Sequence, residues 1–72
     1  MLTYKFLNKI DGEFVFAYYP NGNQNAPGKV AISSNGKGQV IEESKEDFGK
    51  RYAYHAIRGI DTTQESGTVA WY

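Results

Sequence analysis

The stretch SKEDFGKRYAYHAIRG, residues 44–59, decides the fold, because it carries the signals of both ends of a helix. Ser44 stands at an N-cap position and Asp47 follows three residues later, which is a variant of the capping box. Gly59 is typical of the left-handed residue that follows a helix. Together these signals predict one helix over about residues 44–58.

One side of the predicted helix is apolar at the period of an α-helix. Gly49 inside a helix costs ~1 kcal/mol relative to alanine, but beside alanines it would let the helix axis lie close to a sheet. We therefore interpret Gly49 as a packing groove and Phe48 as a core residue. The full set expected to face the sheet is Phe48, Gly49, Tyr52, Ala53, Ala56, Ile57, Gly59 and Ile60.

Short segments with the period-two alternation of strands lie on both sides of this helix. They are residues 2–9, 13–19, 29–33 and 39–42 before the helix and residues 68–72 after it. Asp11-Gly12 and Asn35-Gly36 are turn dipeptides that join the first four segments into two hairpins. The order β-β-β-β-α-β predicts an α+β domain, with one helix packed across one face of a twisted antiparallel sheet of about five strands.

The register of the first hairpin follows from its aromatic residues. A three-residue loop that ends in Gly12 would pair Lys9 with Glu13 and place the aromatic residues of both strands on one face. These residues, with Leu2, should lie under the helix. The set is Leu2, Tyr4, Phe6, Phe14, Phe16 and Tyr18, with the pairs Phe6–Phe16 and Tyr4–Tyr18.

The second hairpin is predicted to use a two-residue type I′ turn at Asn35-Gly36, which pairs Lys29 with Glu42. This register aligns three aliphatic residues toward the core, namely Val30, Ile32 and Ile41. In the last strand, Val69 and Trp71 fall on one face and should join the core as well.

Composition restricts the classes of function. The chain has 72 residues, which we interpret as a single small domain over residues 1–72, and it contains no cysteine. Without cysteine there is no disulfide scaffold and no thiolate zinc site, and the cytoplasm is the expected location. Eight basic and eight acidic residues balance, so the net charge gives no sign of a polyanionic partner. No run is long and apolar enough for a bilayer, so no membrane partner is expected.

Few residues point to catalysis. His55 is the only histidine, and we expect it to lie half-buried against the sheet and bonded to a backbone group rather than to act as a general base. The glycine-rich run at residues 33–38 lacks the Lys-Ser/Thr ending of a phosphate loop and is interpreted as a hairpin turn. No catalytic residue, no metal site and no cofactor is therefore assigned. An acidic cluster is interpreted as a helix start rather than a phosphate mimic: Glu42, Glu43, Glu46 and Asp47.

Two surfaces remain after the core is assigned. The outer face of the sheet is too apolar to be simply solvated and is predicted to bind a partner. A modestly apolar face without a binding role is the alternative interpretation. Its residues are Lys5, Leu7, Val15, Ala17 and Tyr19. The second surface, here called the helix stripe, consists of Lys50, Tyr54 and Arg58 on the opposite side of the helix. A solvated basic face is the alternative interpretation of the helix stripe.

These surfaces support three functional hypotheses. The leading one is a small non-catalytic protein–protein interaction module, which acts either as a homodimer or as an inhibitor or regulator of a larger protein. The second is single-stranded nucleic-acid binding, in which exposed rings stack on bases and basic side chains contact phosphates. The third is an enzyme that depends on His55, which would need an acid or nucleophile within hydrogen-bond reach.

Overall fold

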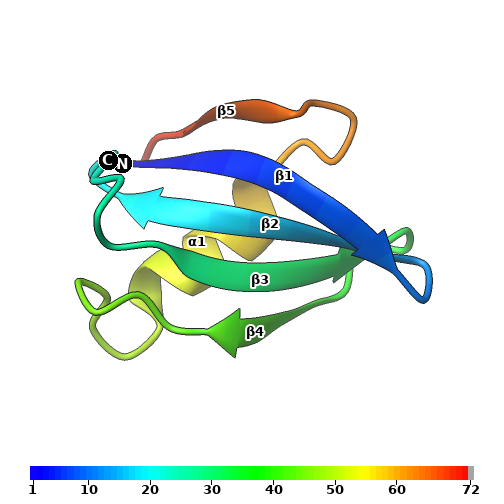
Figure 1. Cartoon of the computed structure of the whole chain (residues 1–72), viewed down its shortest axis with the longest axis horizontal. Coiled ribbons are helices and arrows are strands. Elements are labelled where there is room, and N and C mark those ends of the chain that lie inside the picture. The colour runs from blue at the N-terminus through cyan, green and yellow to red at the C-terminus, as the bar shows by residue number, and fades with distance from the viewer. Residues whose placement is uncertain (72) are drawn as a thin grey trace.

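The computed structural model describes residues 1–71 and shows a five-stranded antiparallel sheet with one helix across one face (Figure 1). In chain order the elements are β1 Leu2–Ile10, β2 Glu13–Pro20, β3 Gly28–Ser33, β4 Gly38–Glu42, α1 Arg51–Gly59 and β5 Ser66–Val69. The strands are arranged in the order β4-β3-β2-β1-β5, so the last strand lies at the edge beside the first. The predicted α+β class and the order of the elements are confirmed.

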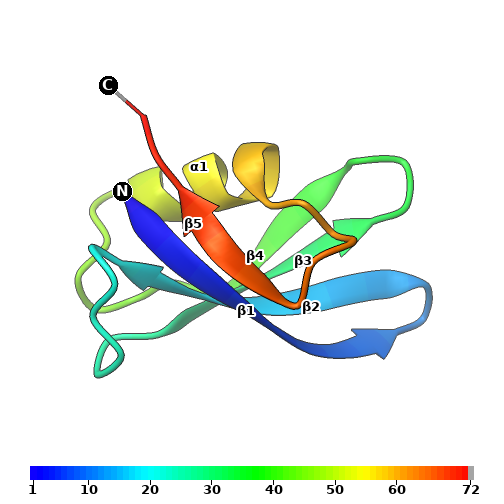
Figure 2. The same cartoon turned by 90° about the horizontal axis from the view of Figure 1, so that it is seen from above.

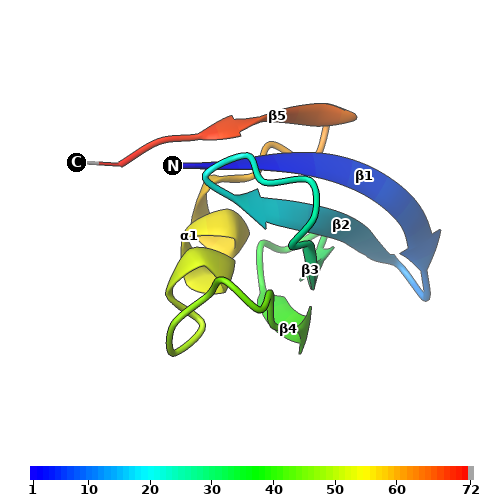
Figure 3. The same ribbon diagram turned by 60° about the vertical axis from the view of Figure 1, so that its left-hand side comes forward.

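Helix α1 lies on the concave side of the twisted sheet (Figure 2, Figure 3). Tyr4 and Phe6 each pack edge-on against Phe16, with ring centroids 5.7 and 5.5 Å apart, a geometry that aromatic pairs favour. On the helix side, Ala53 and Ala56 are fully buried, so the helix axis lies close to these rings. The buried cluster is Leu2, Tyr4, Phe16, Tyr18, Val30, Ile32, Ala53, Ala56 and Ile60, and Phe6, Phe14, Tyr52, Ile57, Val69 and Trp71 pack against it.

The first hairpin forms its predicted aromatic pairs, but its turn and the register next to the turn differ from the prediction. Asp11-Gly12 has φ values of 50° and 81°, which are those of a two-residue type I′ turn. This turn pairs Ile10 with Glu13, so the predicted three-residue loop and the predicted Lys9–Glu13 pair are wrong. A bulge at Leu7 then shifts the register by one residue. Beyond the bulge the aromatic pairs form as predicted: Phe6 with Phe16 and Tyr4 with Tyr18.

The turn of the second hairpin is longer than predicted, whereas the turn of the first is shorter. Gly36 has a φ of 87° and donates its N–H to the Ser33 carbonyl, so the turn is longer than the predicted two-residue type I′ turn. A bulge at Ile41 restores the predicted pair of Lys29 with Glu42. Because the bulge takes Ile41 out of the alternation, this residue is 52% exposed, and its predicted place in the core is wrong.

Helix α1 begins at Arg51 rather than at Ser44, and the chain forms turns over residues 44–50. The predicted capping box does not form, because its two residues bond to other parts of the fold. Ser44 donates its hydroxyl to the Ala26 carbonyl at 2.6 Å, and buried Asp47 accepts a hydrogen bond from the Tyr18 hydroxyl. The helix therefore keeps only the C-terminal part of its predicted range.

Two consecutive residues with positive φ precede the helix: Gly49 at 62° and Lys50 at 61°. These angles lie outside the helical region, and the chain reverses direction there. Phe48 is consequently 90% exposed, and its predicted place in the core is wrong. The packing role predicted for Gly49 is also wrong, because no atom lies within 4 Å of the point where its side chain would begin.

Helix α1 ends with Gly59, which is its last residue rather than the left-handed residue predicted to follow it. A Cβ atom on Gly59 would lie 2.5 Å from Cγ1 of Val69, so glycine is needed where the helix end passes close to β5. Val69 and Trp71 pack against the core as predicted. Strand β5 ends at Val69, and Tyr72, the last residue of the predicted fifth strand, lies outside the described residues.

The Gly59→Ala substitution tests this close approach. At a helix position without tertiary contacts, this change would raise the free energy of unfolding by ~1 kcal/mol. Against Val69 it should instead lower the free energy of unfolding by about 1–3 kcal/mol. Val69→Ala removes the two clashing methyl groups, so the double variant should lose less stability than the sum of the single variants. Urea unfolding of the four proteins, followed by circular dichroism, measures this coupling. Additive losses would contradict the contact.

Candidate functional site

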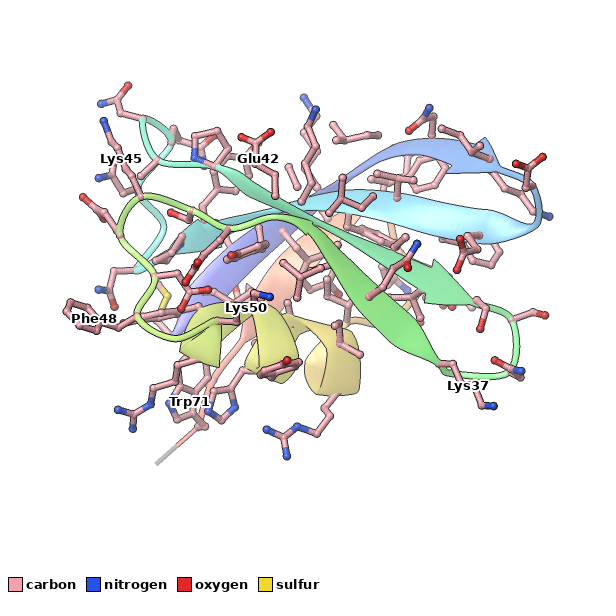
Figure 4. The ribbon with its side chains drawn as sticks, turned by 90° about the horizontal axis from the view of Figure 1, so that it is seen from below. Lys37, Glu42, Lys45, Phe48, Lys50 and Trp71 are labelled. Carbon is pink, nitrogen blue, oxygen red and sulfur yellow. The ribbon has the colours of Figure 1, made fainter. Side chains whose placement is uncertain are left out.

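The strongest candidate site is the segment between β4 and α1, residues 43–50, here called the Phe48 loop. The Phe48 side chain projects away from the fold in Figure 4 and is 90% exposed, although a ring of this size is usually covered in a folded domain. Lys45 and Lys50 belong to the same loop, and Arg51 follows it. All three are exposed. Glu43 and Glu46 of the loop are exposed as well, so the loop presents an aromatic ring together with charges of both signs.

Asp47 fixes the shape of this loop. Its carboxylate accepts hydrogen bonds from the backbone N–H groups of Phe48 at 2.8 Å, Tyr52 at 2.8 Å and Ala53 at 3.0 Å. It also accepts one from the Tyr18 hydroxyl at 2.8 Å. The N–H groups of a first helical turn have no partner within the helix, so Asp47 caps α1 from a position before it. The residue next to Phe48 is thus bonded to both the helix and the sheet.

The same hydrogen bonds set the charge of Asp47. Burial alone would raise the pKa of this carboxyl group, but the hydrogen bonds from Tyr52, Tyr18, Ala53 and Phe48 outweigh burial and hold the pKa below its usual value. Burial raises the pKa of the Tyr18 hydroxyl, and its hydrogen bond to Asp47 adds to the increase. Asp47 is therefore ionised and Tyr18 neutral at physiological pH.

Three further hydrogen bonds hold the rest of the Phe48 loop. Two of them tie the loop to the segment between β2 and β3, and one closes the loop on itself. They join Ser44 Oγ to the Ala26 carbonyl at 2.6 Å, Asn23 Nδ2 to the Glu46 carboxylate at 2.8 Å, and Lys50 N to the Glu43 carboxylate at 2.9 Å. The acidic cluster identified in the sequence is therefore used largely in structural hydrogen bonds, and one of its members, Asp47, caps the helix.

The outer face of the sheet does not present the predicted apolar set. Val15 and Ala17 are 6% and 4% exposed, so the prediction that they form an exposed patch is wrong. Both lie on β2, which has β1 on one side and β3 on the other, so neighbouring strands flank these short side chains on both sides. Lys5 and Leu7 are exposed and Tyr19 is half-buried. A role for this face in binding stays a prediction.

The helix stripe is only partly assembled. Tyr54 and Arg58 lie one turn apart on α1, both exposed, and Arg58 Nε donates to the Tyr54 carbonyl at 3.4 Å. Lys50 precedes the helix in the left-handed conformation, so its predicted position on a helical stripe is wrong. Lys50 belongs to the Phe48 loop, although its side chain points away from that of Phe48 in Figure 4. Partner binding by the stripe stays a prediction.

His55 is half-buried, as predicted, but a stack holds it rather than a backbone bond. Its ring lies parallel to Trp71, with centroids 3.9 Å apart and an interplanar angle of 5°. Within residues 1–71 no hydrogen bond joins the imidazole to a backbone group. Burial lowers the pKa of His55, and the positive charges of Arg58 and Arg51 lower it further.

Sequence reasoning missed Phe48 as a surface residue, although one signal pointed to it. Glycine in a helix interior is unfavourable, and Gly49 is equally typical of a left-handed turn. If the helix is made to start after Gly49, Ser44 and Asp47 become turn residues and Phe48 leaves the helix.

The Asp47→Asn variant tests the role of this carboxylate. The amide keeps the shape of the side chain but loses the charge-assisted hydrogen bonds, so the free energy of unfolding should fall by about 1–3 kcal/mol at neutral pH. The pKa of Asp47 is lowered on folding, so its contribution is complete above about pH 4 and is lost as the pH falls through the folded-state pKa. The stability difference between wild type and variant should therefore shrink in acid.

Urea unfolding at several pH values from neutral to acid checks this expectation. Asp11→Asn is the matched control, because Asp11 lies in an exposed turn, and it should change stability by less than ~0.5 kcal/mol. A wild-type minus Asp47→Asn difference that stays constant with pH would show that the carboxylate charge does not hold the loop.

Within residues 1–71, no group of three or more His, Asp or Glu side chains is arranged to hold a metal ion. Over the same range, no helix has the length and apolar character needed to cross a membrane. No protein-family model matches the chain, and neither a curated protein nor a solved structure shows detectable similarity to it.

Proposed function

We propose that this chain is a protein-binding module that docks through the Phe48 loop. The observation that carries the proposal is a phenylalanine ring, 90% exposed, next to a residue whose carboxylate accepts four hydrogen bonds. The proposed partner is a folded protein with an apolar pocket for the ring and, around that pocket, charges of both signs that match the lysines and glutamates of the loop. This keeps the hypothesis of a non-catalytic interaction module and places its centre on the loop.

A loop that is already fixed favours tight association. Each flexible side chain that binding immobilises costs about 0.5–1.5 kcal/mol, and loop ordering adds to that cost. Here the hydrogen bonds to Asp47 and Glu43 order the backbone before any partner arrives. Burial of a phenylalanine side chain contributes about 1.5–3 kcal/mol.

Single-stranded nucleic-acid binding is the second candidate. The observation in its favour is that exposed Tyr54 lies on α1 with Arg51 and Arg58, on the element that follows Phe48. Rings of this kind stack on bases, and cations contact phosphates. The balanced charge of the chain, and the presence of Glu43 and Glu46 in the Phe48 loop, favour a protein over a polyanion.

The first step of the test places p-benzoylphenylalanine at position 48 and irradiates the chain in an extract of cells that express it. A discrete adduct with a protein is expected. The same analogue at Leu7, an exposed apolar position on the sheet, is the matched control and should not give that adduct. A nuclease-sensitive adduct, or one with a second copy of the chain, would point to nucleic-acid binding or to self-association instead.

The second step purifies the captured protein and measures its affinity for each variant by calorimetry. Phe48→Ala should weaken binding at least about 30-fold, which corresponds to the ~2 kcal/mol loss of an interface anchor. The free energy of unfolding should change by less than ~0.5 kcal/mol, because the ring is exposed in the free chain. Leu7→Ala should leave the affinity unchanged. Equal affinities of wild type and Phe48→Ala would overturn the proposal. A loss of affinity in Leu7→Ala alone would instead support binding through the outer face of the sheet.

A further inference from the structure

Strand β5 forms one edge of the sheet, and the side of it that faces away from β1 is open (Figure 1). Within residues 1–71 no other strand pairs with it on that side. The backbone N–H and C=O groups along an open edge are a template on which another strand can pair. No residue of β5 belongs to the Phe48 loop, so this edge is a separate feature of the fold.

The register of β5 shows which of its backbone groups face the open side. Phe6 donates its N–H to the Glu65 carbonyl at 2.7 Å, and in an antiparallel ladder every second residue bonds to the same neighbour. The residues that bond to β1 are therefore Glu65, Gly67 and Val69, opposite Phe6, Tyr4 and Leu2, and the residues whose N–H and C=O groups face the open side are Ser66 and Thr68.

The two edges of the sheet differ in their protection against strand addition. Natural edge strands usually carry bulges, prolines or charged side chains that prevent such pairing. At the other edge, β4 has a bulge at Ile41 and ends at the charged residue Glu42. Strand β5 pairs with β1 without a bulge, and its four residues, SGTV, include neither a proline nor a charge. Only the shortness of β5 limits the pairing of another strand with it.

The side chains at the open edge favour a second copy of this chain as the partner. In a two-fold arrangement an edge strand runs antiparallel to its own copy, so a charged edge would repel itself. Ser66 and Thr68 are exposed and uncharged, and Ser and Thr opposite each other in antiparallel strands form favourable pairs. We propose that two copies associate through β5, with Ser66 of each copy opposite Thr68 of the other, so that their sheets become one continuous antiparallel sheet.

Gly67 fits this arrangement. It lies between Ser66 and Thr68, so the two-fold axis places it opposite Gly67 of the second copy, in a pair without hydrogen bonds between its residues. Such pairs bring the two backbones closest together, and glycine is typical of strands that another backbone approaches closely. This interface goes beyond the proposed binding through the Phe48 loop and does not involve Phe48.

The first test is the exchange of backbone N–H groups with water, measured by nuclear magnetic resonance at low and high concentrations of the chain. An edge this short makes a small interface, so we expect a Kd of about 0.1–1 mM. Exchange at Ser66 and Thr68 should slow about twofold or more when the concentration is raised from well below this Kd to above it. Gly67 and Val69 bond to β1, so their exchange should be slow at both concentrations, which makes them the internal control.

The second test measures Kd by sedimentation equilibrium for variants of Thr68. Thr68→Pro removes an N–H that β1 does not use, and proline is tolerated at such edge positions. It should raise Kd about fivefold or more, because each copy loses one hydrogen bond. Thr68→Lys keeps the backbone and brings two like charges close to the two-fold axis, so Kd should rise about threefold or more. Gln64→Lys adds the same charge at an exposed residue before β5 and should leave Kd unchanged.

Circular dichroism checks that each variant is folded, and if Thr68→Pro is not, Thr68→Lys and its control decide. The proposal is overturned if the chain sediments as a monomer up to millimolar concentration, if exchange at Ser66 and Thr68 does not depend on concentration, or if Thr68→Lys and Gln64→Lys have equal Kd values. A dimer whose concentration-dependent shifts lie on the outer face of the sheet would also overturn it. None of these outcomes bears on partner binding through Phe48, which is measured with a different variant and a different protein.

Discussion

The buried carboxylate of Asp47 is the constraint on which the remaining structure depends. It accepts one hydrogen bond from Tyr18 on the central strand β2 and two from the first turn of α1, so it joins the two layers of the fold. The Tyr18 hydroxyl in turn accepts the N–H of Ser44 at 3.0 Å. Helix α1 has nine residues, and isolated helices shorter than about 12–15 residues are marginal in water. The helix therefore exists because Asp47 caps it and the sheet covers its buried side.

The exposed ring is a consequence of that network. Once Asp47 is bonded to the sheet and to the helix, the chain has only Phe48, Gly49 and Lys50 with which to reverse direction. Lys50 adopts a left-handed conformation, which costs about 1–2 kcal/mol for a residue with a side chain. The hydrogen bond from its N–H to Glu43 offsets part of this cost. The fold thus combines local strain at Lys50 with an uncovered ring at Phe48, and strained backbone of this kind supports the proposal that the loop binds a partner.

The class and the core of this fold could be predicted from sequence because period-two alternation survives small errors of register. In both hairpins the predicted turn type is wrong, yet a single bulged residue, Leu7 or Ile41, restores the pairing farther along the strands. The helix start could not be predicted, because Ser44 and Asp47 fit a capping box and a turn equally well. The choice between them is made by Tyr18 and Ala26, which lie 29 and 18 residues away along the chain. The exposure of Phe48 followed from that non-local choice, so local patterns could not reveal it.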